Sequence, residues 1–274
     1  MNGVYRTEAG GRAVREQYRA VLEQWPVEAE HVRLPTRAGE TFVVASGPVD
    51  APPLVALHGS GGNATTWLAD IATWAPHLRV YAVDLIGEPG LSAPTRPELG
   101  SEEFAGWLDD VFAGLGLEAA AVLGMSLGGW LAVDYASRRP ERVTKLALIA
   151  SAGIGRRTHG WLLPALPYFV MGDWGRRRIV RIVTGADLGP VRAAIAATFR
   201  HFRPRTEIPV FDDAVLRSLT MPVLAVVGGR DVMIDSRATA RRLAALVPHA
   251  DVRVVPEAGH LVVGQADAVL GFLL

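Results

Sequence analysis

The chain has 274 residues, half of them hydrophobic and a fifth charged, which is the composition of a globular protein with enough apolar material for a sizeable core. Lysine and arginine number 28, as do aspartate and glutamate, so no global positive field attracts nucleic acid or an anionic membrane. The absence of cysteine excludes a disulfide framework, a thiolate nucleophile and cysteine-ligated zinc. A small, uncharged or weakly charged substrate is the partner that this composition favours.

The first 25 residues contain no apolar signal core, and no run of 18 or more apolar residues occurs anywhere. We therefore expect a cytoplasmic protein that does not act at a membrane. Whether it is a monomer or a homodimer is left open by the sequence.

The first predicted elements are a helix and a hairpin. Residues 12–24 place apolar side chains near one helical face, which predicts an amphipathic helix outside the sheet, ending before Pro26. Two β-rich stretches follow at residues 32–36 and 41–46. Because Ala38-Gly39 between them supplies a turn, they predict an antiparallel hairpin.

Short apolar runs then alternate with helix-length segments. They occupy residues 54–59, 79–84, 120–126, 145–151, 222–229 and 251–257. Continuous apolar strands that alternate with helices are typical of a mostly parallel sheet covered on both faces. Together with the hairpin, they predict an α/β fold with a mostly parallel, eight-stranded sheet.

The alternation stops between residues 153 and 213, where several helical stretches but no buried strand are expected. This predicts a core of residues 1–152 and 214–274 with a helical cap, residues 153–213, inserted into it. The insertion is rich in large apolar residues, namely Trp161, Leu162, Leu163, Leu166, Tyr168, Phe169, Trp174, Phe199 and Phe202. Two interpretations remain open: these side chains form an apolar lid over a pocket, or they bury one another in a helical subdomain.

The candidate nucleophile is Ser126, in a Gly-x-Ser-x-Gly motif at residues 124–128. The motif follows an apolar strand and precedes a helical pattern, so Ser126 lies at a sharp strand-to-helix turn. Gly124 and Gly128 remove Cβ atoms that would collide there, and the Leu127 N–H can stabilise a developing oxyanion. The alternative is a glycine-rich turn that serves packing alone.

A second oxyanion donor is expected in the glycine-rich loop after the strand at residues 54–57. The Ser60 N–H is the first choice and the Gly61 N–H the second. His58 ends the strand itself, and we interpret it as structural. No phosphate-binding or dinucleotide-binding motif occurs, so nucleotide binding is not expected.

The candidate base is His260, because it alone among the seven histidines follows the final strand in a glycine-containing loop. Asp231 follows the preceding strand, where it can orient the imidazole. Asp235 is its rival, but it precedes a helical segment and is better placed as a helix N-cap.

Asp84 ends another strand, and we interpret it as a brace for the loops around the site. A two-carboxylate glycosidase built from Asp84 and Asp231 is the alternative, but it leaves the serine turn without a role.

With these motifs in place, the chain resembles the α/β-hydrolase superfamily over nearly its whole length, through HGSGGNATTW, DLIGEPGLSAP, GMSLGG, GGRDVMID and AGH. Within it, the amino-terminal part looks like bacterial carboxylesterase-like serine hydrolases. The resemblance implies an acyl-enzyme mechanism without metal or organic cofactor, carried by Ser126, Asp231, His260 and the Ser60 and Leu127 amides. Serine at position 126 argues against the haloalkane dehalogenases and epoxide hydrolases of this fold, which use aspartate.

The tail after His260 is short for the final helix of that family, so the packing of this helix is open. The function expected is cleavage of a carboxylic ester of a small, hydrophobic substrate. A carbon–carbon bond hydrolase with the same triad and a ligand receptor without turnover are the alternatives.

Overall fold

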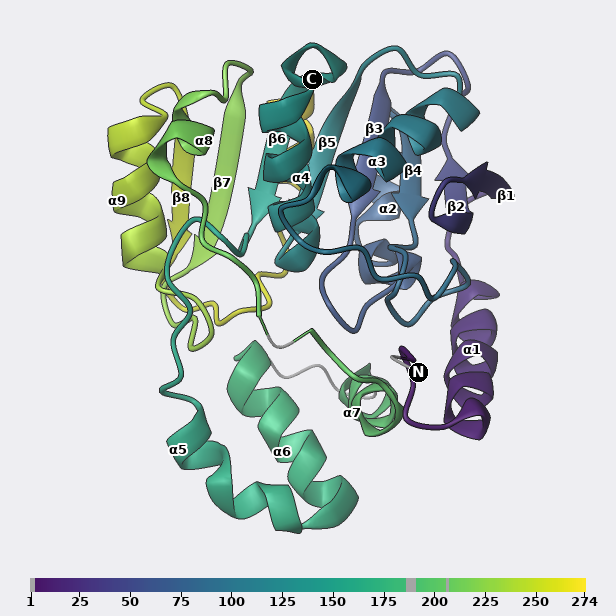
Figure 1. Cartoon of the computed structure of the whole chain (residues 1–274), viewed down its shortest axis with the longest axis vertical. Coiled ribbons are helices and arrows are strands. Elements are labelled where there is room, and N and C mark those ends of the chain that lie inside the picture. Colours follow the sequence, from purple (N-terminus) through teal and green to yellow (C-terminus); the bar gives the residue numbers. More distant parts are fainter. Residues whose placement is uncertain (1–2, 186–190, 206) are drawn as a thin grey trace.

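The computed structural model describes residues 3–185, 191–205 and 207–274, and its centre is one eight-stranded sheet (Figure 1). The strands are β1 (Ala29–Thr36), β2 (Gly39–Ser46), β3 (Pro53–Leu57), β4 (Arg79–Val83), β5 (Ala120–Met125), β6 (Val143–Ile149), β7 (Val223–Gly228) and β8 (Asp251–Val255). Their order is β1-β2-β4-β3-β5-β6-β7-β8. The pairs β1–β2 and β2–β4 are antiparallel and the others parallel, which confirms the predicted fold class.

Helices cover both faces of this sheet, and further helices lie in the 153–213 insertion. They are α1 (Glu8–Leu22), η1 (Ala64–Trp67), α2 (Ile71–Trp74), α3 (Glu102–Gly114), α4 (Leu127–Arg138), η2 (Pro140–Arg142), α5 (Leu162–Ala165), η3 (Leu166–Val170), α6 (Gly172–Thr184), α7 (Val191–His201), α8 (Asp213–Arg217), α9 (Ser236–Leu246) and α10 (Ala266–Leu273). Buried side chains of α3, α4, α8 and α9 join one hydrophobic cluster, and those of α1, η1, α2 and α10 join another. The two clusters explain why the central strands are apolar on both sides.

The first helix begins earlier than the sequence pattern predicts. Thr7 is its N-cap and accepts a hydrogen bond from the Gly10 N–H at 3.0 Å. Glycine has a low helix propensity, so the glycines at positions 10 and 11 gave no sign of this first turn in the sequence. A Cβ on Gly10 would lie 2.5 Å from His201 Nδ1, so close packing against α7 requires glycine there.

The short tail does form a final helix, α10. Its Val269 and Leu273 are buried. The Trp74 indole N–H donates to the Ala266 carbonyl at 3.0 Å, and Lys145 Nζ donates to the carbonyls of Phe272 and Leu273, each at 2.9 Å. Polar bonds to the core therefore hold the helix at both ends.

Within the described residues of the 153–213 insertion there are helices but no strand, and two isolated bridges join it to the rest of the chain, Arg157 to Ile234 and Phe202 to Tyr5. Arg242 of α9 ties both ends of the insertion to the core, because its guanidinium donates to the carbonyls of Ile154 and Phe211. No helix in the described ranges is long and apolar enough to span a membrane.

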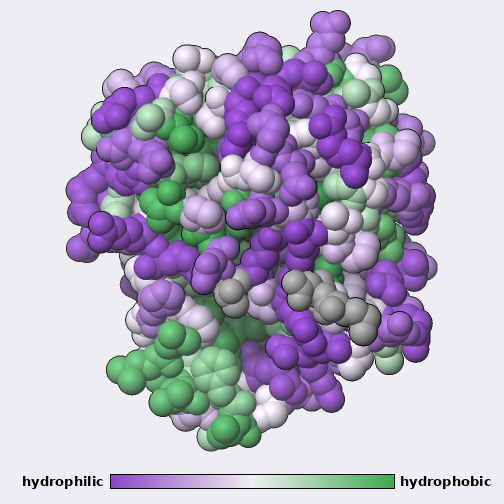
Figure 2. Space-filling view, in the orientation of Figure 1, coloured by the Kyte–Doolittle hydropathy of each residue, from purple (hydrophilic) through white to green (hydrophobic). Residues whose placement is uncertain are grey.

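The interpretation that the large apolar residues of the insertion bury one another is wrong for most of them. Leu163 is 80% exposed, Leu166 65%, Phe169 54% and Trp174 53%, whereas Phe202 is fully buried. Figure 2 shows the apolar area over α5 and η3 at the lower left. The core clusters contain none of these exposed residues, since α5, η3 and the start of α6 extend away from the sheet (Figure 1).

Candidate active site

Ser126 lies at the turn between β5 and α4, in a strained conformation. Its φ of 51° is positive, which costs a non-glycine residue on the order of 1–3 kcal/mol. The flanking glycines are sterically required: a Cβ on Gly124 would lie 2.4 Å from the Gly128 carbonyl oxygen, and one on Gly128 would lie 2.1 Å from that of Leu57. The predicted sharp turn is therefore confirmed, and it holds the serine hydroxyl at the edge of the sheet.

The structure brings Ser126, His260 and Asp231 together, although they come from three loops far apart in sequence. Ser126 Oγ lies 3.0 Å from His260 Nε2, and His260 Nδ1 lies 2.8 Å from Asp231 Oδ2. Because Asp231 accepts at Nδ1, the proton of a neutral imidazole is held there, and Nε2 is left free to accept from the serine hydroxyl. The geometry suits general-base activation of Ser126.

Asp231 is itself held rigidly. Its side chain is 1% exposed, and its Oδ1 accepts hydrogen bonds from the N–H groups of Met233 and Ile234 at 2.7 and 3.0 Å. Asp235, the rival acid, caps α9 instead and accepts from the Ala238 N–H at 2.9 Å. Asp231 thus lies against His260, and Asp235 lies at the start of α9.

The loop after β3 lies directly beside the serine. Leu57 of β3 pairs with Gly124 of β5, so both strands end at the same edge, and a Cβ on Gly59 would lie 3.4 Å from Ser126 Cβ. The N–H groups of Ser60 and Leu127 donate to no other group among the described residues. Two unpartnered amides beside a nucleophile are suited to bind an oxyanion.

The second-choice donor, the Gly61 N–H, already has a partner. It donates to Glu88 Oε2 at 2.8 Å, and the Ser60 hydroxyl donates to the same oxygen at 3.1 Å. Sequence analysis passed over Glu88, because a glutamate in a loop is ordinarily solvated. The only available signal was its place between Gly87 and Pro89, in a segment expected to border the site.

His58 is fully buried and forms part of the loop framework. Its Nε2 accepts from the Leu85 N–H at 2.9 Å, so its Nδ1 carries the proton and donates to the Gly59 carbonyl at 2.8 Å. Burial lowers the pKa of His58 to about 4, an effect that the bond to Gly59 partly offsets. Both nitrogens of the neutral ring are thus engaged within the loop framework, in agreement with the structural role predicted for it.

Asp84 braces the same region. Its carboxylate accepts from the Tyr18 hydroxyl at 2.9 Å, from the Ala64 N–H at 2.8 Å and from the Leu91 N–H at 2.7 Å. Burial raises the pKa of Asp84 to about 6, and the hydrogen bonds from Leu91, Ala64 and Tyr18 oppose this rise. With both oxygens occupied, Asp84 is committed to holding α1, η1 and its own loop, as expected of a brace.

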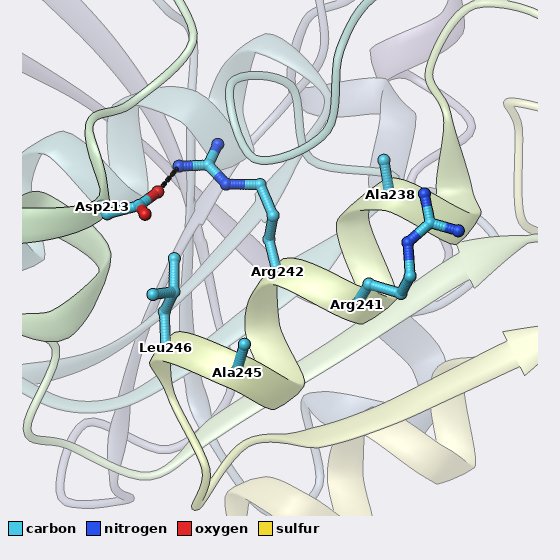
Figure 3. A pocket seen from close by; sticks show the side chains of 6 residues that line it. All are labelled: Asp213, Ala238, Arg241, Arg242, Ala245 and Leu246. Carbon is cyan, nitrogen blue, oxygen red and sulfur yellow. Dashed lines mark hydrogen bonds and ion pairs between the residues drawn. The ribbon is translucent and has the colours of Figure 1, made fainter.

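A surface pocket lies away from this constellation, between α8 and α9 (Figure 3). It is lined by Asp213, Ala238, Arg241, Arg242, Ala245 and Leu246. Arg242 points at Asp213 across the pocket and forms an ion pair with it at 2.6 Å. This pocket contains no serine, threonine or histidine, and its one carboxylate, Asp213, is paired with Arg242. In the described ranges, no group of three histidine, aspartate or glutamate side chains is placed to hold a metal ion.

Comparison with known proteins gives a consistent result. The sequence matches the Alpha/beta hydrolase family over residues 54–272. It is 35% identical over 257 residues to carboxylesterase YbfK of Bacillus subtilis, covering 90% of this chain and 86% of that protein. The crystal structure of that carboxylesterase, CesB (YbfK), superposes with a TM-score of 0.83 at 33% identity, over 96% of each chain.

The crystal structure of the naproxen esterase (carboxylesterase NP) from Bacillus subtilis superposes with a TM-score of 0.85 at 31% identity, over 97% of each chain. Both superpositions thus cover nearly the whole chain. The chain therefore belongs to the alpha/beta hydrolase family, as a carboxylesterase-like member.

Proposed function

We propose that this protein hydrolyses carboxylic esters of small, hydrophobic substrates through an acyl intermediate on Ser126. The observation that carries the proposal is the continuous path from Ser126 Oγ to His260 and Asp231, at 3.0 and 2.8 Å, beside two unpartnered amides. The names of the relatives, carboxylesterase and naproxen esterase, support the same reaction class.

In each half of the proposed reaction, one proton passes through His260 Nε2. His260 Nε2 takes the hydroxyl proton as Ser126 Oγ bonds to the ester carbonyl carbon, and the Ser60 and Leu127 amides bind the resulting oxyanion. Collapse of this intermediate breaks the bond to the alcohol, which leaves with the proton from Nε2. A water molecule then gives its proton to Nε2 and attacks the acyl group, after which the acid departs and Ser126 regains its proton.

The proposal includes residues 153–213 as a cap on a core of residues 1–152 and 214–274. In support, the Leu261 N–H donates to the Thr184 carbonyl at 3.1 Å, which places the end of α6 against the loop of His260. Phe199 of α7 reaches the loop of Ser60, because a Cβ on Gly61 would lie 2.4 Å from its ring. Substrate selection is therefore assigned to the cap.

The test is hydrolysis of p-nitrophenyl esters from acetate to dodecanoate by the wild type, Ser126→Ala and His260→Ala. Ser218→Ala, which changes an exposed serine directly after α8, is the matched control and should behave as the wild type. We expect loss of kcat by at least about a thousandfold in the first two variants. Retained hydrolysis in folded Ser126→Ala contradicts the assignment. Cleavage of a vinylogous diketone without ester turnover would make a carbon–carbon bond hydrolase the better description.

A further inference from the structure

Glu88 is a buried acid that the proposed reaction does not use. It lies in the loop after β4, is 3% exposed, and its Oε2 accepts from both the Gly61 N–H and the Ser60 hydroxyl. These two residues form the segment whose Ser60 amide faces the oxyanion in the proposed function. Glu88 thus contacts the Ser60–Gly61 segment, which we call the oxyanion segment, and is not itself one of the reacting groups.

A carboxyl group at this position is costly for the fold. Burial raises the pKa of Glu88 to about 7, while the Gly61 N–H, Arg96, the Ser60 hydroxyl and Arg205 act in the opposite direction. Its Oε1 has no hydrogen-bond partner among the described residues. An apolar side chain of similar volume would avoid this desolvation cost, so stability alone does not account for the glutamate.

Arg96 is itself anchored, which keeps its charge close to Glu88. Its Nε donates to the Gly87 carbonyl at 2.8 Å, and a terminal nitrogen donates to the Arg203 carbonyl at 2.7 Å. Arg96 therefore connects the loop of Glu88 to the chain that leaves α7. A positive charge that lowers the pKa of Glu88 is therefore bound to the same loop.

Other bonds join the two loops on either side of the Ser60–Gly61 segment, and the Gly62 N–H donates to the Gly59 carbonyl at 3.0 Å across it. The Leu85 N–H donates to His58, Asn63 Nδ2 donates to the Pro89 carbonyl at 3.1 Å, and the Ala64 N–H donates to Asp84. These contacts fix residues 58 and 63–64. Among the described side chains, only Glu88 accepts hydrogen bonds from the segment between them, where Gly61 adopts a φ of +80°.

We propose that Glu88 is a positioning residue that holds the Ser60–Gly61 segment so that the Ser60 amide stays directed at the oxyanion. This inference rests on the ester hydrolysis proposed above, and it gives Glu88 no contact with substrate. An oxyanion donor acts mainly on the transition state, so a displaced Ser60 amide lowers kcat and leaves KM nearly unchanged.

The experiment compares Glu88→Ala and Glu88→Gln with the wild type. Asp134→Ala is the control, because Asp134 is another buried acid with an unpartnered oxygen, on α4 about 12 Å along the helix from Ser126. We expect Glu88→Ala to lower kcat about ten- to a hundredfold with KM within about twofold. Affinity for an alkyl trifluoromethyl ketone, which forms a tetrahedral oxyanion on serine, should fall in parallel with kcat.

Glu88→Gln keeps an oxygen that accepts the Gly61 N–H, so it should recover most of the lost kcat. Glu88→Gln also keeps the shape of the side chain, so it tests the proposal even if Glu88→Ala fails to fold. Equal losses in the two variants, or an equal loss in Asp134→Ala, would overturn the positioning role, as would an unchanged kcat in Glu88→Ala.

Hydrogen exchange of the Gly61 amide separates this inference from the proposed function, because it needs no substrate. Exchange should accelerate at least about tenfold in Glu88→Ala, and unchanged exchange overturns the inference. A wild type that hydrolyses no ester would contradict the proposed function, and accelerated exchange would still support Glu88 as the anchor of the segment.

Discussion

Gly185, which ends α6, and Gly259, which precedes His260, pack backbone against backbone. A Cβ on Gly259 would lie 2.6 Å from both Gly185 Cα and the Thr184 carbonyl oxygen. No side chain fits between them, so the insertion and the loop of His260 are in direct contact. The position of the imidazole is therefore tied to the position of α6.

Gly259→Ala should displace this loop and disturb the contact between His260 and Ser126. We expect kcat/KM to fall about ten- to a hundredfold and the free energy of unfolding to fall by about 1–3 kcal/mol. Gly271→Ala is the matched control, because a Cβ at this exposed position of α10 meets nothing within 4 Å. It should raise the free energy of unfolding by about 0.5–1 kcal/mol without affecting activity. Wild-type kinetics in Gly259→Ala would disprove the coupling.

Ser126→Gly and Ser126→Ala should differ in stability although both lose activity. The positive φ of Ser126 is strained for any residue with a Cβ, and alanine keeps that strain whereas glycine relieves it. Glycine also increases the entropy of the unfolded chain, which offsets part of this gain. The glycine variant should therefore be more stable than the alanine variant by about 1 kcal/mol. Urea unfolding of the two proteins measures this difference, and a less stable glycine variant would contradict the strain.

His58 should remain neutral, with its proton on Nδ1, throughout the range from pH 5 to 8. Burial holds its pKa at about 4, and the Leu85 N–H requires an acceptor at Nε2. Two-dimensional ¹H–¹⁵N spectra of the imidazole nitrogens report charge and tautomer directly. A protonated His58 near pH 6, or a proton on Nε2, would show that the loop is arranged differently.

Asp70→Asn should stabilise the protein at neutral pH and have little effect near pH 4. Burial raises the pKa of Asp70 to about 6 from its ordinary 3.8, so the folded state binds the proton more tightly than the unfolded state. Its contribution to stability is present below pH 4 and is lost as the pH rises to about 6. The variant avoids this loss, which we put at about 1 kcal/mol after allowing for solvent screening.

Urea unfolding at pH 4, 5, 6 and 7 checks the Asp70 prediction. Asp50→Asn, which removes one negative charge from an exposed loop, is the control and should follow the wild type. A constant difference between Asp70→Asn and the wild type over this range would refute the assigned burial effect.

The central part of the sheet was predictable because its strands are buried on both faces. All five residues of β4 and all six of β7 are buried, so each appears in the sequence as a continuous apolar run. The edge strand β1 has only one buried residue, Leu34, and its start at Ala29 was missed by three residues. A strand that is covered on one face only has a much weaker apolar signal in the sequence.

The grouping of Ser126, Asp231 and His260 was also predictable, because each follows an apolar run and parallel strands end at one edge of a sheet. The exposed apolar residues of the insertion were not. Leu163 and Phe169 are of residue types that are common in protein cores. Only the direction in which α5 and η3 leave the sheet determines that these side chains are exposed. Hydrophobicity gives the preference of a side chain for burial, not the presence of a neighbour to bury it.

The sequence by itself determined the fold class, the order of the strands along the chain and the residues that end them, since these follow from local runs of apolar residues and turns. The tertiary structure decided which groups are partners. In the tertiary structure the Gly61 N–H donates to Glu88, the Ser60 N–H has no partner among the described residues, and Gly185 packs against Gly259. Such contacts depend on distances between loops that are far apart in sequence, and no local pattern of residues encodes those distances.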